Sequence, residues 1–150
     1  MSESLSGQLA LVTGAGRGLG RACAEGLADA GARVIATART ASDLEALAAH
    51  ASGRIETWTG DVTDDACVAR VAAIEGVSIL VNNAGVNRPQ PFVEVDAESL
   101  DFVLNLNVRA AFRVAQAAAQ AMLRTGGPGA IINMSSQMGH VGSPKRSVYC

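Results

Sequence analysis

A glycine-rich loop near the start of the chain constrains the fold more than any other feature. The loop covers residues 13–20 (TGAGRGLG), follows an apolar run at residues 9–12 and precedes an alanine- and leucine-rich stretch at residues 21–30. A strand, a glycine loop and a helix in this order are typical of a site that binds the pyrophosphate of a dinucleotide. Glycines let the backbone turn and approach the phosphates, and the helix N-terminus attracts the anion. An ordinary tight turn is the alternative, since such turns also use glycine.

Length and composition indicate one ordered domain over residues 1–150. The chain has 150 residues, of which 49% are hydrophobic and 17% charged, enough apolar surface for a packed core. The net charge of −2, without a basic cluster, argues against a nucleic-acid partner. No apolar run approaches the roughly 18 residues that span a bilayer, and the polar N-terminus lacks a signal sequence. Cys23, Cys67 and Cys150 fit neither a disulfide framework nor a zinc site, so we predict a cytoplasmic protein without a metal or a membrane partner.

Strand-like and helix-like segments alternate along the chain. Apolar and β-branched runs predict five strands, at residues 9–12, 33–37, 54–59, 77–81 and 130–134. Helical patterns predict four helices, at about residues 21–30, 42–50, 63–75 and 97–123. Ser42 and Glu45 have the spacing of a capping box, Asp96 suits the N-cap of the long helix, and the glycines at 126–129 end it.

The alternation of strands and helices predicts an α/β fold in which a parallel sheet is covered by helices on both faces. Right-handed crossovers make this a doubly wound, Rossmann-type sheet, here with its first five strands. Ligands bind such folds beyond the carboxyl ends of the strands. Polar and glycine residues follow every predicted strand, at residues 13–20, 38–39, 60–62, 82–85 and 135–136.

The residues after the second, third and fourth predicted strands suit a dinucleotide. An NAD site usually has an acidic residue at the end of the second strand, whereas this chain has Ala38 followed by Arg39. Arg39 and Arg17 are suited to a 2′-phosphate, so we predict NADP(H), with solvated surface arginines as the alternative. Asp61 is either an acceptor for the adenine amino group or a turn residue. The segment at residues 82–85 either lies against ribose and nicotinamide, ties the strand end to its neighbours, or forms an Asx turn.

Two hydroxyl side chains follow the fifth predicted strand. Ser136 lies just after it, and the only tyrosine of the chain, Tyr149, comes thirteen residues later. A serine hydroxyl can hold a carbonyl oxygen in place, and a tyrosine hydroxyl can deliver a proton to a carbonyl that receives a hydride. A phenol does this near neutral pH only beside a cation that favours its ionised form. Taken alone, both residues read as polar loop positions.

Taken together, these segments resemble the compact branch of the short-chain dehydrogenase/reductase family. The matching elements are the loop T-G-x-x-x-G-x-G, Asp61-Val62, Asn82–Gly85, Asn107, Ser136 and Tyr149, in the family's order and at close to its spacing. The resemblance implies that Ser136 orients the substrate oxygen, that Tyr149 is the general acid or base, and that Asn107 supports a proton relay. The implied cofactor-binding residues are Gly14, Ala15, Gly16, Arg17, Gly18, Leu19, Gly20, Arg39, Asp61, Val62, Asn83, Ala84 and Gly85.

The resemblance also implies a reaction, which is hydride transfer between NADP(H) and a carbonyl or secondary alcohol. NAD(H) is the alternative cofactor, and the substrate classes are 3-oxoacyl groups, polyols and ketones. Gln137, Met138, His140 and Val141 follow the serine and are expected at the pocket entrance.

The family places a lysine four residues after the tyrosine, whereas this sequence ends at Cys150. We therefore expect the chain to be the first three-fifths of a member, with an exposed fifth strand and little turnover by itself. The full-length form is implied to be a homodimer or homotetramer that associates through the long helix. A non-catalytic dinucleotide-binding module, complete at residue 150, is the alternative.

Overall fold

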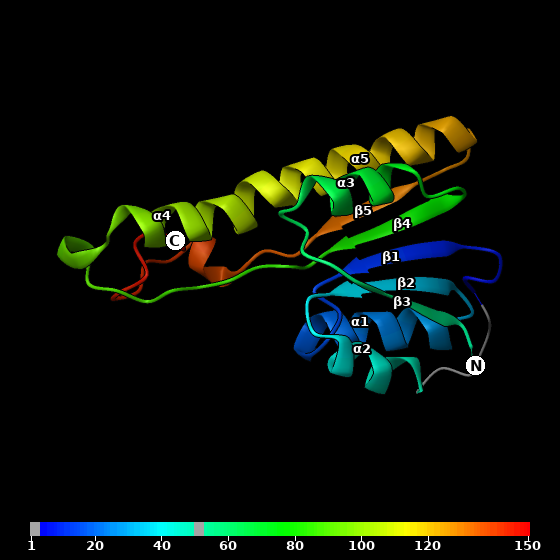
Figure 1. Cartoon of the computed structure of the whole chain (residues 1–150), viewed down its shortest axis with the longest axis horizontal. Helices are drawn as coiled ribbons and strands as arrows, with labels where there is room; N and C mark the ends of the chain where they lie inside the picture. The colour runs from blue at the N-terminus through cyan, green and yellow to red at the C-terminus, as the bar shows by residue number, and fades with distance from the viewer. Residues whose placement is uncertain (1–3, 50–52) are drawn as a thin grey trace.

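The computed structural model describes residues 4–49 and 53–150. In this part of the chain five parallel strands form a single sheet, in the spatial order β3-β2-β1-β4-β5. The strands are β1 (Leu9–Thr13), β2 (Arg33–Ala38), β3 (Ile55–Thr59), β4 (Val77–Asn82) and β5 (Ala130–Asn133) (Figure 1). The helices are α1 (Gly18–Asp29), α2 (Ala41–Ala48), α3 (Asp65–Ala72), α4 (Ala97–Leu104) and α5 (Ala111–Thr125). The predicted α/β fold with a doubly wound parallel sheet is confirmed.

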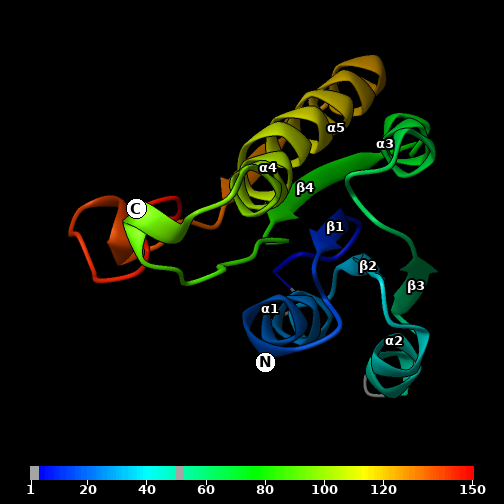
Figure 2. The same cartoon turned by 60° about the vertical axis from the view of Figure 1, so that its left-hand side comes forward.

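Helices cover both faces of the sheet (Figure 2). Successive residues of a strand point to opposite faces, and β1 shows the consequence. Val12 packs in the core beneath α1 and α2 together with Leu44, whereas Leu11 packs in the core beneath α3 and α5 together with Val114. All four side chains are at most 1% exposed. Burial on both faces explains why the central strands read as continuous apolar runs rather than as alternating ones.

The start of α2 differs from the prediction. The helix begins at Ala41 with Thr40 at its N-cap, and no side-chain capping hydrogen bond is made there. Ser42 therefore lies inside the first turn, and the predicted capping box at Ser42 and Glu45 is wrong. Asp43 instead places a carboxylate in the first turn, where the helix dipole favours negative charge. The predicted end of this helix at His50 lies outside the described residues.

The long helix predicted at residues 97–123 is interrupted. A π-helical segment, Asn105–Ala110, separates α4 from α5, and α5 continues to Thr125. Gly126 then ends the helix in the left-handed conformation, with φ 73°, as the glycine cluster predicted. Within the π-helical segment, the side-chain amide of Asn107 donates to the Val86 carbonyl at 2.7 Å and accepts from the Val86 N–H at 2.8 Å. This pairing holds the interrupted turn against the segment that follows β4.

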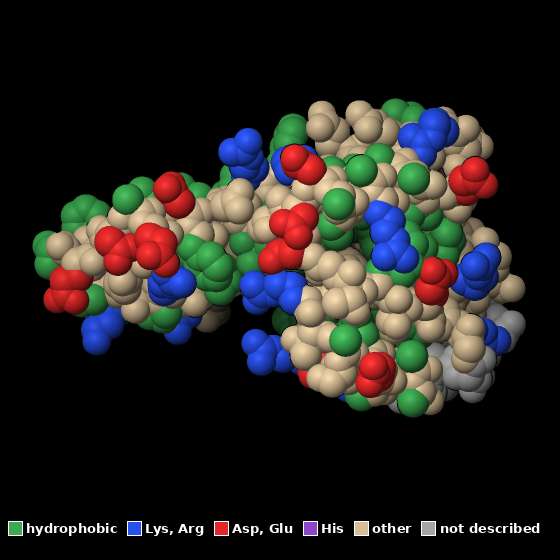
Figure 3. Space-filling view, viewed as in Figure 1, with side chains coloured by type: hydrophobic (Ala, Val, Ile, Leu, Met, Phe, Trp, Pro, Cys, Tyr) green, Lys and Arg blue, Asp and Glu red, His purple; other side chains and the backbone are tan. Residues whose placement is uncertain are grey.

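The sheet has an exposed edge at β5. Ile131 and Ile132 are 39% and 49% exposed, which agrees with the expectation of an open fifth strand. Past the carboxyl ends of the strands, α4 and the last residues of the chain form an arm that projects beyond the sheet (Figure 1). Figure 3 shows that the arm is narrower than the rest of the molecule, and that Lys and Arg side chains gather beside the notch between them. The carboxyl ends of the strands point toward this notch (Figure 1).

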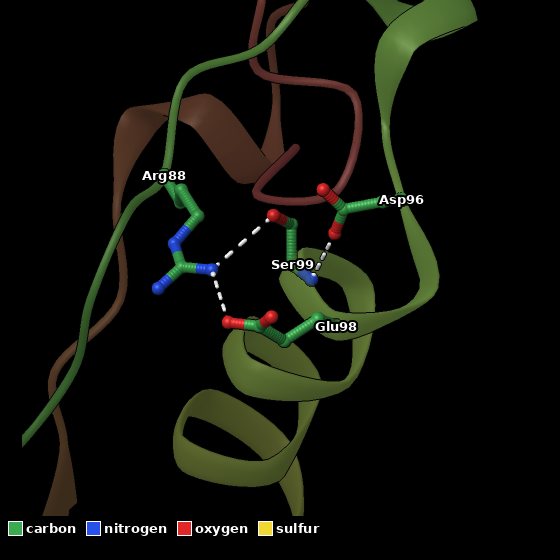
Figure 4. Close-up of polar contacts among 4 residues, drawn as sticks. All are labelled: Arg88, Asp96, Glu98 and Ser99. Carbon is green, nitrogen blue, oxygen red and sulfur yellow. Dashed lines mark hydrogen bonds and ion pairs between the residues drawn. The ribbon is translucent and has the colours of Figure 1, made fainter.

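A polar cluster fixes the start of α4 (Figure 4). Asp96 is the N-cap, as predicted, and its carboxylate accepts a hydrogen bond from the Ser99 backbone N–H at 2.6 Å. Arg88, from the segment after β4, donates to Ser99 Oγ at 3.3 Å and lies 3.4 Å from Glu98 Oε1. Its guanidinium also lies 4.4 Å from the centre of the Phe102 ring. Arg88 therefore ties the segment after β4 to the first turns of α4.

The hydrogen bonds to Ser99 hold the pKa of Asp96 below its ordinary value of 3.8. A carboxyl whose pKa is lower in the folded than in the unfolded protein stabilises the fold above pH 3.8, and this contribution is lost as the pH falls through the folded value.

We expect Asp96→Ala to lower Tm by roughly 3 °C at neutral pH, and the difference from the unmodified chain to shrink in strong acid. Thermal unfolding at several pH values measures this. Asp64→Ala is the control, because Asp64 caps α3 without a side-chain hydrogen bond; an equal loss there contradicts the prediction.

Candidate active site

The glycine loop joins β1 to α1, and its backbone lies close to the residues that follow β4. Gly14 and Gly18 have φ values of +64° and +58°, which side chains other than glycine rarely adopt. The N-cap residue Arg17 makes no side-chain capping hydrogen bond, and the first turn of α1 holds no acidic residue. The first N–H groups of α1 therefore lack a side-chain acceptor, which is the arrangement that suits a phosphate. The loop thus fits the pyrophosphate of a dinucleotide.

Thr13 connects the glycine loop to the end of β4. Its side chain is completely buried. The hydroxyl oxygen accepts hydrogen bonds from the backbone N–H groups of Asn83 at 2.9 Å and Ala84 at 3.0 Å. The hydroxyl also points at Asn82 Oδ1, 3.5 Å away. One threonine therefore fixes the backbone after β4 against the end of β1.

The two asparagines after β4 use their side chains to join strand ends. The Asn83 amide donates to the carbonyl oxygens of Thr13 at 3.0 Å and Gly14 at 3.2 Å. The Asn82 amide donates to the Ala111 carbonyl oxygen at 2.8 Å and to Asn133 Oδ1 at 3.1 Å. Of the alternatives for this segment, the contacts match the one in which asparagine ties the strand end to its neighbours. The Asn83 side chain is thus already engaged, and its predicted contact with the nicotinamide ribose stays a prediction.

The residues predicted for catalysis line one pocket of about 720 Å³. Ser136 and Tyr149 come from the segment after β5, and Asn107 comes from the π-helical segment. Ser136 Oγ accepts from the Met138 N–H at 3.2 Å. The rest of the lining includes Leu19 from the glycine loop and the segment after β4: Asn82, Asn83, Ala84, Gly85, Val86 and Asn87. The pocket therefore brings the predicted catalytic residues to the glycine loop and the end of β4.

The segment that carries Tyr149 is held by backbone hydrogen bonds. The Tyr149 N–H donates to the Arg146 carbonyl oxygen at 2.9 Å, and the Gln90 N–H donates to the Lys145 carbonyl oxygen at 2.8 Å. Lys145 has a φ of +62°, unusual for a residue with a side chain. The Gln90 contact attaches this segment to the residues after β4. The two segments that line the pocket, one after β4 and one after β5, are therefore held together. Of the four residues expected at the entrance, none lines the pocket, whereas their neighbour Gly139 does.

The predicted nucleotide-selecting residues lie at the ends of β2 and β3. Arg39 Nη1 is 3.8 Å from Asp61 Oδ2, and the two side chains are 65% and 31% exposed. The other Asp61 oxygen accepts from the Thr63 N–H at 2.9 Å and from its hydroxyl at 2.8 Å. Asp61 therefore serves as a turn residue, and only its Oδ2, which faces Arg39, is left for a ligand. Val62 is buried in the core, and Arg17 is exposed.

Cys67 lies close to the end of β3. Its Sγ is 3.5 Å from the point where a Cβ on Gly60 would lie. Burial raises the pKa of the Cys67 thiol above its ordinary value of 9.0, and the nearby carboxylates of Asp61 and Asp64 raise it further. The thiol is therefore protonated and unreactive near neutral pH. Residues 4–49 and 53–150 contain no group of three or more His, Cys, Asp or Glu side chains that would hold a metal ion.

Sequence reasoning missed the roles of three residues. Thr13 stood in the glycine motif without an assigned function, and neither Val86 nor Asp43 was singled out. The partners of Thr13 and Val86 lie 70 and 21 positions away along the chain, so no local pattern reveals them. The signal that was available is the type of residue: a threonine at the buried end of a strand needs a hydrogen-bond partner.

This arrangement matches a known family. The profile of the family described as short chain dehydrogenase matches residues 8–150. The chain belongs to this family. L-xylulose reductase of Mesocricetus auratus is 43% identical over 151 residues, which cover 100% of this chain and 62% of that protein. Carbonyl reductase [NADPH] 2 of Sus scrofa is 41% identical over 150 residues, 99% of this chain and 61% of that protein.

Solved structures give the same result. A crystal structure described as a putative NAD(P)-dependent gluconate 5-dehydrogenase from Beutenbergia cavernae, with bound NADP at low occupancy, superposes with a TM-score of 0.88 at 36% identity. It covers 99% of this chain, and this chain covers 62% of it. The chain therefore spans about three-fifths of the length of the relatives that it matches. No helix in the described part of the short-chain dehydrogenase chain is long and apolar enough for a membrane crossing.

Proposed function

We propose that this chain is the nucleotide-binding part of an NADP(H)-dependent oxidoreductase that interconverts a carbonyl and a secondary alcohol. One observation carries the proposal: a single pocket brings Ser136 and Tyr149 to the glycine loop and to the end of β4. In a doubly wound fold, this is the place where a dinucleotide lies against the carboxyl ends of the strands. NADP(H), when bound there, supplies or accepts the hydride.

The side chains of this short-chain dehydrogenase do the remaining work. The glycine loop and the first N–H groups of α1 hold the pyrophosphate. The Ser136 hydroxyl donates a hydrogen bond to the substrate oxygen and orients it. In the whole enzyme, the Tyr149 hydroxyl gives a proton to that oxygen during reduction and takes it back during oxidation, beside the lysine that the family places four residues later. Asn107 holds Val86 at both backbone groups, so we assign it a positioning role; its part in a proton relay stays a prediction.

We propose a small polar carbonyl compound or polyol as the substrate class. Relatives of the chain are called L-xylulose reductase and carbonyl reductase [NADPH], and a related structure is described as a putative gluconate 5-dehydrogenase. The pocket wall supports this choice, because asparagine and serine side chains supply hydrogen-bonding groups for hydroxyls. Of the three classes considered from the sequence, this choice favours polyols and simple ketones, while a related structure described as a putative betaketoacyl-ACP reductase supports the 3-oxoacyl class.

The cofactor proposal rests on the ends of the glycine loop and of β2. Arg17 and Arg39 are exposed there, and no acidic residue occupies position 38. A 2′-phosphate suits this pair of arginines, and the ion pair of Arg39 with Asp61 is long and mostly exposed, so it costs little to break. The NADP in one related structure and the name of the porcine reductase agree with this choice.

We also propose that the full-length protein is a cytoplasmic homodimer or homotetramer. Leu100 and Leu104 lie on α4 and are 40% and 42% exposed, an apolar surface that a second subunit would cover. The described cysteines are all free, which suits a reducing compartment.

Arg39→Ala is expected to weaken NADPH binding by about tenfold and NADH binding by less than about twofold, because only NADPH carries the 2′-phosphate. Fluorescence titration of the purified chain with both nucleotides measures the two affinities. Arg33→Ala is the matched control, since Arg33 is an exposed arginine at the opposite end of β2. An unchanged NADPH preference in Arg39→Ala contradicts the role of Arg39, and a chain that binds neither nucleotide contradicts the proposed function.

A further inference from the structure

Asp43 places a carboxylate against the glycine loop. A Cβ on Gly16 would lie 3.0 Å from Asp43 Cβ and 3.3 Å from Asp43 Oδ2, and 3.2 Å from Ala38 Cβ. Gly16 is buried, and the Asp43 side chain is only partly exposed. The carboxylate therefore lies in the gap between the glycine loop and the end of β2. A side chain at position 16 would press on Asp43, which would have to move by a few tenths of an ångström.

This gap is where a nucleotide-selecting acid is expected in a doubly wound fold. The acid that usually follows β2 accepts hydrogen bonds from an unmodified ribose and repels a 2′-phosphate. Position 38 is alanine, so the backbone end of β2 supplies no such group. Asp43 Oδ2 lies within reach of the same place from the first turn of α2. Asp43 thus brings a carboxylate close to the end of β2, although position 38 itself is not acidic.

The charges around the gap nearly cancel. Arg17 and Arg39 are the two cations proposed to bind a 2′-phosphate. Arg39 already lies 3.8 Å from Asp61 Oδ2, and Asp43 adds a second negative charge next to the loop that carries Arg17. Opposite charges at such a site reduce the attraction for a phosphate, and selectivity between two ligands often depends on a repulsive group of this kind.

We propose that Asp43 is a specificity-determining residue that limits the preference of this short-chain dehydrogenase for 2′-phosphorylated nucleotides. The inference rests on the proposed function, because it assumes that the adenosine end of a dinucleotide lies at Arg39 and the glycine loop. The Asp43 carboxylate repels a 2′-phosphate and accepts a hydrogen bond from a free ribose 2′-hydroxyl. The chain therefore keeps a measurable affinity for NADH alongside NADPH.

The experiment uses two ligands that differ only at the 2′ position, adenosine 2′,5′-bisphosphate and adenosine 5′-monophosphate. Isothermal titration of each into the purified chain gives the ratio of their affinities. In Asp43→Asn we expect this ratio to rise about fivefold in favour of the bisphosphate, because one full charge is removed from the gap. Glu45→Gln is the matched control: it removes the same charge from an exposed position of the same helix, and the ratio should stay within about twofold.

The readout separates selectivity from stability. Asp43 also favours the N-terminus of α2 through the helix dipole, and loss of that effect would change both affinities together and leave their ratio unchanged. Asp43→Ser is the second variant, because serine is well tolerated near a helix start. An unchanged ratio in both variants, or an equal rise in Glu45→Gln, overturns the inference while nucleotide binding itself persists. If the unmodified chain binds neither ligand, the proposed function fails first and the inference fails with it.

Discussion

Thr13→Val is expected to lower the free energy of unfolding by about 2 kcal/mol, although valine and threonine have nearly the same shape. The Thr13 hydroxyl accepts hydrogen bonds from the N–H groups of Asn83 and Ala84, at 2.9 and 3.0 Å. Valine leaves both donors without an acceptor in a part-buried place, and each lost acceptor costs roughly 1 kcal/mol or more. The end of β4 then loses its attachment to β1, so nucleotide binding should weaken as well.

Thr37→Val is the matched control for this prediction. Thr37 is the partner of Thr13 on β2 and is 1% exposed. Among the described residues its hydroxyl oxygen has no hydrogen-bond partner apart from a weak interaction with the Cys67 thiol. Valine should therefore be neutral there, or stabilising by up to about 1 kcal/mol.

Urea unfolding followed by circular dichroism measures both variants. Thr13→Ser keeps the hydroxyl and should recover most of the stability that valine loses, apart from about 1 kcal/mol for the missing methyl group. Equal losses in the two valine variants would mean that the Thr13 hydrogen bonds contribute nothing specific. A serine variant as unstable as the valine variant would lead to the same conclusion.

The features that sequence reasoning predicted are those with a local signature. The strands are short apolar or β-branched runs, and each ends in a polar or glycine residue, so the five strands and the site edge follow from the pattern alone. Asp96 and Gly126 were predicted for the same reason, because helix caps act within one turn. The convergence of Ser136 and Tyr149 on the glycine loop follows once the strands are parallel, since their carboxyl ends meet at one edge.

The features that were not predicted depend on partners far along the chain. The α4–α5 helix has a continuous helical pattern, and its interruption is associated with Asn107, which pairs with Val86. The start of α2 was misplaced because Ser42 and Glu45 match a capping box, yet the N-cap is Thr40, two residues earlier. Asp43 gained a place beside the glycine loop only when β2 and α2 folded against it. In each case tertiary packing, rather than local sequence, decides the outcome.

Gly20→Ala is expected to destabilise the short-chain dehydrogenase chain by about 3 kcal/mol and to reduce nucleotide affinity by at least about tenfold. Gly20 is buried in the first turn of α1. An added Cβ would lie 2.3 Å from the Gly14 carbonyl oxygen and 2.4 Å from the Asn83 side-chain nitrogen. Both distances are far below van der Waals contact, and the first concerns rigid backbone. The glycine loop must therefore move away from α1, which opens the proposed pyrophosphate site.

Gly26→Ala provides the opposite case in the same helix. A Cβ on Gly26 would have no neighbouring atom within 4 Å. Alanine is a better helix former than glycine, so this variant should be more stable by about 0.5–1 kcal/mol and should bind nucleotide normally. Thermal unfolding and NADPH titration of the two variants give a direct comparison. If Gly20→Ala binds NADPH as tightly as Gly26→Ala does, the glycine loop does not hold the pyrophosphate, because a loop displaced by a side chain at position 20 cannot keep its phosphate contacts.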